Sequence, residues 1–192
     1  MGPKFALAAG LTSRLLARAG AAAAYALFAT ATAQAQETAA ASANAELIAN
    51  LSLAKTQDMD FGLIVAPNAG RVDMTAEASA TCTANNGLVH SGACLPAGFG
   101  GVSTFGLTLR IQMPPGRRLF LSGPGTVMRI NRLAPGGESG LSFVGRTGRN
   151  YRYLVTDPAG TFAFFVGGRL RVANGQVPGT YTGTFDVTVD YN

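Results

Sequence analysis

The last fourteen residues of the chain, 179–192, alternate between apolar and polar side chains up to the terminus. This period of two is typical of a strand with one buried face, so the segment predicts a single long terminal strand. The strand either pairs within its own sheet or is offered to another polypeptide. The predicted core face carries Tyr181, Phe185, Val187, Val189 and Tyr191 together with Gly183. The predicted polar face carries Thr182, Thr184, Asp186, Thr188 and Asp190.

Further short strands are predicted along the rest of the chain. They cover residues 47–53, 59–61, 72–76, 105–113, 119–122, 127–133, 141–144, 151–155, 162–166 and 170–173. Turns rich in glycine and proline separate them, at 114–116, 123–125, 134–137, 157–160 and 167–168. These breaks leave no room for a long helix, so the pattern predicts an all-β fold. Many short strands without crossover helices favour an antiparallel sandwich of two sheets.

The first 35 residues have the pattern of a cleaved secretory signal peptide. Lys4, Arg14 and Arg18 precede an apolar stretch at 19–31, and Ala33 and Ala35 form an A-x-A cleavage pattern. A membrane anchor is the alternative, but the apolar run is shorter than the ~20 residues that span a bilayer. We therefore expect export through the inner membrane, a mature chain without an integral membrane segment, and a location in the periplasm and then at the cell surface or outside the cell.

A leader with few large apolar residues, 36–50, follows the cleavage site and precedes the predicted domain at 51–192. Such a composition favours a flexible segment or one that becomes ordered against a partner. At its end Leu47, Ala49, Leu51 and Leu53 alternate with more polar positions. These four residues are candidates for a strand that is donated to another subunit.

The charge of the mature chain is modest. The whole chain has a formal net charge of +5, and removal of the three basic residues of the signal peptide leaves about +2. This excess does not favour nucleic-acid binding. Arg146, Arg149 and Arg152 form a local cluster, which is either a patch for an anionic polysaccharide or lipid headgroup or a solvated loop face.

Cys82 and Cys94 are the only cysteines of the chain. An exported protein meets an oxidising compartment, so the two are expected to form a structural disulfide that closes a loop. A redox role would require a C-x-x-C pair, and a metal site would require more ligands than two sulfurs and His90. We expect no cofactor.

Catalytic motifs are not evident. A single histidine excludes H-E-x-x-H, and a Ser-His-Asp triad would have to recruit His90 from inside the disulfide loop. The run at 137–140 resembles a nucleophile elbow, but Leu141 stands where G-x-S-x-G requires glycine, so we interpret it as a turn. Asp58 and Asp60 are either calcium ligands or solvated carboxylates on a polar strand face. We expect no catalytic residues and no enzyme.

Three segments carry a family resemblance, at 51–62, 166–172 and 177–192. They resemble the bacterial domain of unknown function numbered 4402, which is similar to spore-coat-U-like and chaperone-usher pilin domains. The resemblance covers nearly the whole mature chain. It implies an immunoglobulin-like, pilin-like β-sandwich that builds surface fibres rather than an enzyme.

The pilin comparison implies roles for particular residues. Pilin subunits end in an alternating strand with a penultimate aromatic residue and a glycine fourteen residues from the end, positions that Tyr191 and Gly179 occupy here. Such subunits lack a final strand, and their exposed groove is filled first by a periplasmic chaperone and then by the amino-terminal extension of the next subunit. The resemblance implies that Phe185, Val187, Val189 and Tyr191 form the groove wall.

Two functions follow as expectations. The first is a secreted structural subunit of a bacterial surface assembly, pilus-like or coat-like, that associates with copies of itself or other surface subunits, with a periplasmic chaperone and usher as possible partners. The alternative is a self-contained, monomeric binding module in which residues 47–53 fold onto their own sheet and the terminal strand pairs internally.

Overall fold

The computed structural model describes residues 50–192, which lie within one compact unit. This part of the chain is all-β, as the sequence predicts, and every strand pairing in it is antiparallel. Its helical content is one short 3-10 turn, η1 (Pro115–Arg117). No helix of these residues is long and apolar enough to cross a membrane. The expected signal peptide lies outside the described residues.

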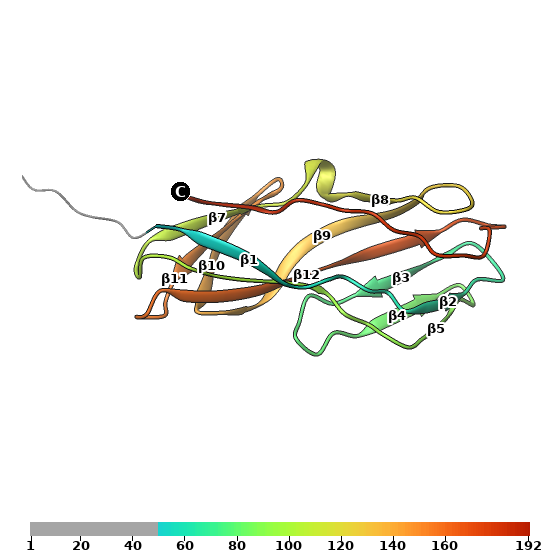
Figure 1. The fold of residues 1–192 in the computed structure, drawn as a ribbon, viewed down its shortest axis with the longest axis horizontal. Helices are drawn as coiled ribbons and strands as arrows, with labels where there is room; N and C mark the ends of the chain where they lie inside the picture. The colour runs from blue at the N-terminus through green and yellow to red at the C-terminus, as the bar shows by residue number, and fades with distance from the viewer. Residues whose placement is uncertain (1–49) are drawn as a thin grey trace, which may run out of the picture. The chain divides into compact units, whose positions relative to one another are not determined.

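The larger sheet has seven strands and is built around β12 (Thr161–Val172). One side of β12 pairs first with β6 (Ala97–Val102) and then with β3 (Gly70–Met74), while β9 (Met128–Ser139) follows its other side. Beyond these lie β1 (Ser52–Gln57) next to β6, β4 (Cys82–Asn85) next to β3, and β8 (Leu119–Leu121) next to β9. Figure 1 shows β12 and β9 as the long strands of this sheet.

The second sheet has four strands in the order β10-β11-β7-β13. These are β10 (Leu141–Thr147), β11 (Asn150–Val155), β7 (Thr108–Gln112) and β13 (Thr188–Tyr191). A third, small sheet pairs β2 (Leu63–Val65) with β5 (Val89–Ser91).

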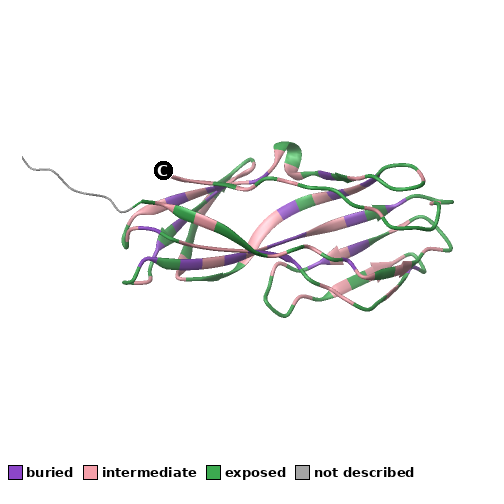
Figure 2. Cartoon of the chain, in the orientation of Figure 1, coloured by how far each residue is buried: buried purple, intermediate pink, exposed green. Residues whose placement is uncertain are grey.

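The two larger sheets share one hydrophobic core. Alternating side chains of β7 and β11 meet those of β9 and β12 there, which is why these strands have purple positions at regular intervals in Figure 2. Phe164 of the large sheet and Leu109 and Tyr153 of the smaller one are almost fully buried. A core filled from both sheets fixes the register of each strand, since a slip of one residue would turn its apolar side chains outward.

Two predicted breaks are wrong. Residues 167–168 lie inside β12 and residues 134–137 lie inside β9, so two strands are longer than the sequence indicates. Gly167 is required by close packing, because a Cβ there would lie 2.6 Å from the carbonyl oxygen of Met74. The pairing of β9 with β12 shifts its register next to this site, so the glycines mark irregularities within the ladder rather than strand ends.

Four strands are missed by the sequence pattern: β2, β4, β5 and β6. The most informative case is β6, whose sequence contains three glycines. Gly101 lies between β1 and β12, and a Cβ there would lie 2.0 Å from the carbonyl oxygen of Ser52. Glycine in this strand therefore allows a close approach of backbones, which side-chain alternation does not indicate.

The terminal strand is shorter than predicted. Regular pairing is confined to β13, although Thr182 also forms an isolated bridge with Ser122. The alternation of the segment nevertheless persists, since the five apolar side chains predicted for the core face are half-buried and Thr182, Thr184, Asp186 and Thr188 are exposed. The expected strand at 59–61 is likewise reduced to a single bridge between Asp60 and Leu95.

Candidate functional site

The C-terminal segment, residues 179–192, lies along the edge of the fold. Its last strand pairs with β7 in the register Val189 to Ile111 and Tyr191 to Leu109. No strand pairs with the other edge of β13 in the part of the chain that the structure describes. None of residues 173–192 is fully buried, and the red segment of Figure 1 accordingly has no purple position in Figure 2.

The apolar side chains of this segment cover the core only partly. Tyr181, Phe185, Val187, Val189 and Tyr191 all pack against the core and remain half-exposed. A paired edge strand whose inward side chains are still half-exposed leaves apolar surface beside unpaired backbone groups. These two features together are what an added strand uses, since the main chain provides pairing and the side chains provide contact.

The start of the described chain borders the core in a similar way. Leu53 lies in β1 opposite Gly101 of β6, and Leu51 and Leu53 are half-buried against the core. The outer edge of β1 has no strand partner among residues 50–192. Leu47 and Ala49, the other two candidate donor residues, lie outside the described residues.

Contacts with β6, the neighbour of β1, join the C-terminal segment to the sheet that ends in β1. The ring of Phe99, on β6 next to β1, meets the ring of Phe185 edge to face at 6.4 Å between centroids. The Tyr191 hydroxyl accepts a hydrogen bond from the Ser103 hydroxyl at 3.4 Å and lies 3.5 Å from the hydroxyl of Thr104. We use the name terminal seam for the half-buried apolar side chains of the two edges together with Phe99, that is, Leu51, Leu53, Phe99, Phe185, Val187, Val189 and Tyr191.

Tyr191 is tied to the loop that follows β6. Burial raises the pKa of its phenol, but the hydrogen bonds from Ser103 and Thr104 outweigh burial and lower the pKa below the ordinary value. These bonds hold the end of the chain against the residues that follow β6. Tyr191, the penultimate residue, therefore anchors the end of the C-terminal segment.

Gly179 begins the C-terminal segment and has a structural reason to be glycine. Its φ of 149° lies in a region that residues with a Cβ rarely adopt, and a Cβ would lie 2.5 Å from the Cγ of Pro124. Directly after it, the Tyr181 ring packs against the Gly123 backbone, and the Tyr181 hydroxyl donates a hydrogen bond to the carbonyl of Val177 at 2.8 Å. The loop at 123–125 and the start of the terminal segment thus hold each other in place.

The expected disulfide between Cys82 and Cys94 is confirmed, with 5.8 Å between the Cα atoms. The enclosed residues form more than a loop, because they include most of β4 and all of β5. His90 lies between the cysteines with its Nε2 3.1 Å from the carbonyl oxygen of Ala93. No group of three or more His, Cys, Asp or Glu side chains that could hold a metal occurs in residues 50–192.

The other residues considered from the sequence have local partners. Asp58 pairs with Lys55, and the Asp60 carboxylate accepts a hydrogen bond from the backbone amide of Gly62 at 2.7 Å. The sequence interpretation of 137–140 as a turn is wrong for most of its length, because Glu138 and Ser139 belong to β9. Tyr153 donates a hydrogen bond to Glu138 at 2.6 Å, and burial together with that carboxylate raises the pKa of the tyrosine.

The arginines of the predicted cluster have different contacts. The Arg146 guanidinium lies 5.6 Å from the centroid of the Tyr151 ring, whereas Arg149 donates to the carbonyl oxygen of Met113. Arg152 stands opposite Arg110 on β7, and Arg110 forms an ion pair with Asp190. Sequence proximity alone suggested this cluster, and its members have separate partners.

A different set of arginines is brought together by the register of the large sheet. Arg129, Arg171 and Arg71 stand directly opposite one another on β9, β12 and β3. They are more than 40 residues apart along the chain, so no local pattern indicates them. Only the strand register shows that these arginines lie together, and β12 sets that register through its pairings on both sides.

Residues 50–192 thus form an all-β fold with antiparallel sheets and one disulfide. The chain belongs to the family described as domain of unknown function DUF4402, whose model matches residues 51–191. No curated protein and no solved structure matches the chain.

Proposed function

We propose that this protein is a secreted structural subunit of a bacterial surface assembly, pilus-like or coat-like, that is built by strand pairing between subunits. The observation that carries the proposal is the terminal seam, where two edges without strand partners in residues 50–192 flank half-buried apolar side chains. We further propose that the fold is an immunoglobulin-like, pilin-like sandwich, which the shared core of the two larger sheets supports.

An added strand would gain energy from two sources at the seam. Each main-chain hydrogen bond to an edge contributes about 1 kcal/mol net. Burying the exposed parts of side chains such as Phe185 and Val187 contributes about 25 cal/mol for each Å² of apolar surface removed from water. For a strand of five or six residues, the main-chain hydrogen bonds would give affinity and the alternating side chains would give specificity.

The donated strand is proposed to come from the leader, residues 36–50, of a neighbouring subunit. Leu53 is paired in its own chain with β6, so a donor must lie upstream of Ser52. Leu47 and Ala49 are the candidate donor residues that remain available. Donation from one subunit to the next is heterologous and does not close into a ring, so it would extend into a filament.

The protein would reach the assembly by export and delivery from the periplasm. The chain would be exported, held in the periplasm by a chaperone that covers the terminal seam, and passed to an usher or directly to the growing assembly. It would act through binding and not as an enzyme. The half-exposed apolar side chains of the seam support the need for a covering partner before assembly.

A self-contained monomeric binding module is the second candidate. The observation in its favour is that β1 and β13 both pair within the chain, with β6 and β7 respectively. On this alternative, the seam is a tolerated edge or is covered by the leader of the same chain. The two candidates therefore differ in whether the seam is covered from within or from a neighbouring subunit.

The experiment that tests assembly replaces the seam's inward side chains with charge. The variant Val189→Asp/Tyr191→Asp should prevent the formation of oligomers in the exported protein, because a strand cannot be buried against two carboxylates. The matched control is Thr188→Asp, on the exposed face of the same strand. Oligomers that persist unchanged in the double variant, with a cooperative melting transition retained, would refute the proposal.

A further inference from the structure

A row of arginines crosses the outer face of the large sheet. Arg129 of β9, Arg171 of β12 and Arg71 of β3 stand opposite one another in register, and Phe120 of β8 extends the row at one end. Their neighbours along each strand, Ile130, Leu170 and Val72, are buried in the core. The arginines therefore lie on the opposite face, away from the core.

Like charges directly opposite on neighbouring strands destabilise a sheet. Arg71 is partly neutralised by Asp73, whose carboxylate lies 3.2 Å from its Nε. No carboxylate pairs with Arg129 or Arg171 within residues 50–192. Two uncompensated guanidinium groups thus face each other across adjacent strands, an arrangement that a bound anion would relieve.

The row lies in a surface groove of about 530 Å³. Besides the three arginines its lining includes Phe120, Val127 and Asn86, but no acidic residue. Phe120 and Val127 expose 59% and 58% of their surface, which gives the groove an apolar wall beside the charges. A ligand that combines anionic groups with flat apolar faces matches this lining.

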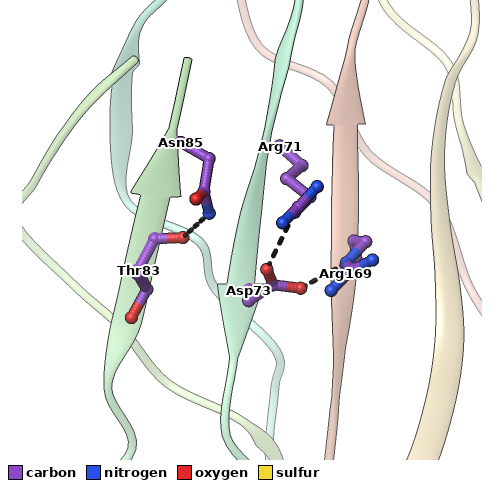
Figure 3. A network of polar contacts seen from close by, with 5 residues as sticks. All are labelled: Arg71, Asp73, Thr83, Asn85 and Arg169. Carbon is purple, nitrogen blue, oxygen red and sulfur yellow. Dashed lines mark hydrogen bonds and ion pairs between the residues drawn. The ribbon is translucent and has the colours of Figure 1, made fainter. Parts of the chain in front are cut away.

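A second hollow continues the basic surface along the same strands. Its volume is about 180 Å³, and Arg132, Arg169 and Asp73 are in its lining. Arg169 lies two positions from Arg171 on β12, hence on the same face. Figure 3 shows Asp73 between Arg71 and Arg169, bonded to both. Five arginines and one aspartate therefore line the two hollows, and Asp73 bonds to one arginine of each.

We propose that this surface binds an anionic polysaccharide, with the guanidinium groups of Arg129 and Arg171 contacting its carboxylate or sulfate groups. Guanidinium groups bind planar oxyanions through paired hydrogen bonds, which favours arginine at such a site. A polymer fits the two hollows because its anionic groups repeat along its length. Phe120 and Val127 provide the surface against which a sugar ring packs.

The site is independent of assembly by the terminal seam. The seam involves the inward side of β1 and the C-terminal segment, whereas the arginine row is on the outward face of β3, β9 and β12. A monomeric module and a fibre subunit could both present it. The failure of one proposal therefore leaves the other standing.

Binding is tested with the exported full-length protein by isothermal titration calorimetry. The probes are oligogalacturonate for carboxylate groups, dextran sulfate oligosaccharide for sulfate groups, neutral dextran, and inorganic phosphate as the free anion. We expect at least one of the two charged oligosaccharides to bind, neutral dextran not to bind, and inorganic phosphate to bind at least tenfold more weakly. Binding should weaken by about tenfold or more between about 50 and 500 mM sodium chloride.

The decisive variant is Arg129→Gln/Arg171→Gln, compared with Arg118→Gln/Arg152→Gln, which removes two exposed arginines elsewhere. The first pair should weaken oligosaccharide binding by about tenfold or more, and the second by less than about twofold. The first pair should also keep or raise Tm, because it removes opposed like charges. Equal losses in both variants, or no binding of either charged oligosaccharide, would overturn the proposal.

Discussion

Phe99 and Phe185 meet edge to face across the core, with 6.4 Å between their ring centroids. Phe99 also stacks on the fully buried Phe164, at 5.3 Å between centroids, so the C-terminal segment is joined through one aromatic contact to the centre of the large sheet. This contact fixes the terminal segment over β6 while leaving its outer edge without a strand partner in residues 50–192. The segment is thereby anchored, and its outer edge is the one to which the proposed function assigns a further strand.

The aromatic contact gives the first prediction. Phe185→Ala should lower the free energy of unfolding by about 2 kcal/mol, because it removes packing from a half-buried site. Thr184→Ala, at the neighbouring exposed position, should change it by less than about 0.5 kcal/mol. Urea denaturation followed by tyrosine fluorescence measures both. Equal stability of the Phe185 variant and the unsubstituted protein would show that the terminal segment does not pack as described.

The second prediction concerns the glycines of β6. Gly101→Ala should destabilise the fold by about 2 kcal/mol or more, because the new Cβ would lie 2.0 Å from the Ser52 carbonyl oxygen and push β1 away. Gly100→Ala is the matched control on the same strand, since its nearest neighbour would lie at an ordinary contact distance of 3.5 Å. Thermal melting monitored by circular dichroism distinguishes the two. Similar losses in both variants would contradict the close pairing of β1 with β6.

The third prediction concerns acid stability. Burial raises the pKa of Asp73, but hydrogen bonds and charges from Arg169 and Arg71 outweigh it and lower the pKa below 3.8. A carboxyl with a lower pKa in the folded chain stabilises the fold above its ordinary value, and the stabilisation is lost as the pH falls through the folded value. Asp73→Asn should therefore lower Tm at pH 7, and the difference from the unsubstituted protein should shrink below pH 3.8.

Asp58→Asn is the control for Asp73. The Asp58 side chain is 83% exposed and its pair with Lys55 lies at the surface, so this variant should have an almost unchanged Tm across the same pH range. A Tm difference for Asp73→Asn that stays constant down to pH 2 would show that the two arginines do not stabilise the ionised carboxylate.

The fourth prediction concerns the disulfide. Cys82→Ser/Cys94→Ser should destabilise the fold by about 3 kcal/mol, the chain-entropy contribution of a loop of this length. A reducing agent should destabilise the unsubstituted protein by a similar amount and leave the double variant unaffected. Denaturation curves with and without reductant give both values. Full reduction without loss of stability would mean that β4 and β5 are held by packing alone.

Much of the fold follows from side-chain alternation. The strands that carry large apolar residues at every second position, such as β7 and β11, are predicted by the sequence because their side chains line the core directly. The errors at the missed strand β6 and the wrongly interrupted strand β12 have a different cause. Their glycines serve close contacts between backbones, at Gly101 and Gly167, and such contacts depend on strands that are remote in sequence.

The same distinction holds for the sites. The apolar positions of the C-terminal segment were predicted as one face of a strand, because their alternation is local, and the structure places Phe185 and Val189 against the core. Phe99, the part of the terminal seam that lies in the missed strand β6, was not predicted. The arginine row was not predicted, because Arg71, Arg129 and Arg171 are brought together only by strand register. The local cluster that includes Arg146 and Arg149 was considered instead, and its members have separate partners.

In the proposed assembly, the terminal seam accepts a strand from the leader of a neighbouring subunit. The most direct test is the mass distribution, by size-exclusion chromatography with light scattering, of the exported chain from residue 36 and of a version that begins at Asn50, just before β1. Strand donation predicts oligomers that resist mild denaturant for the longer chain and their absence for the shorter one. A stable monomer from both chains would contradict it and establish the self-contained module.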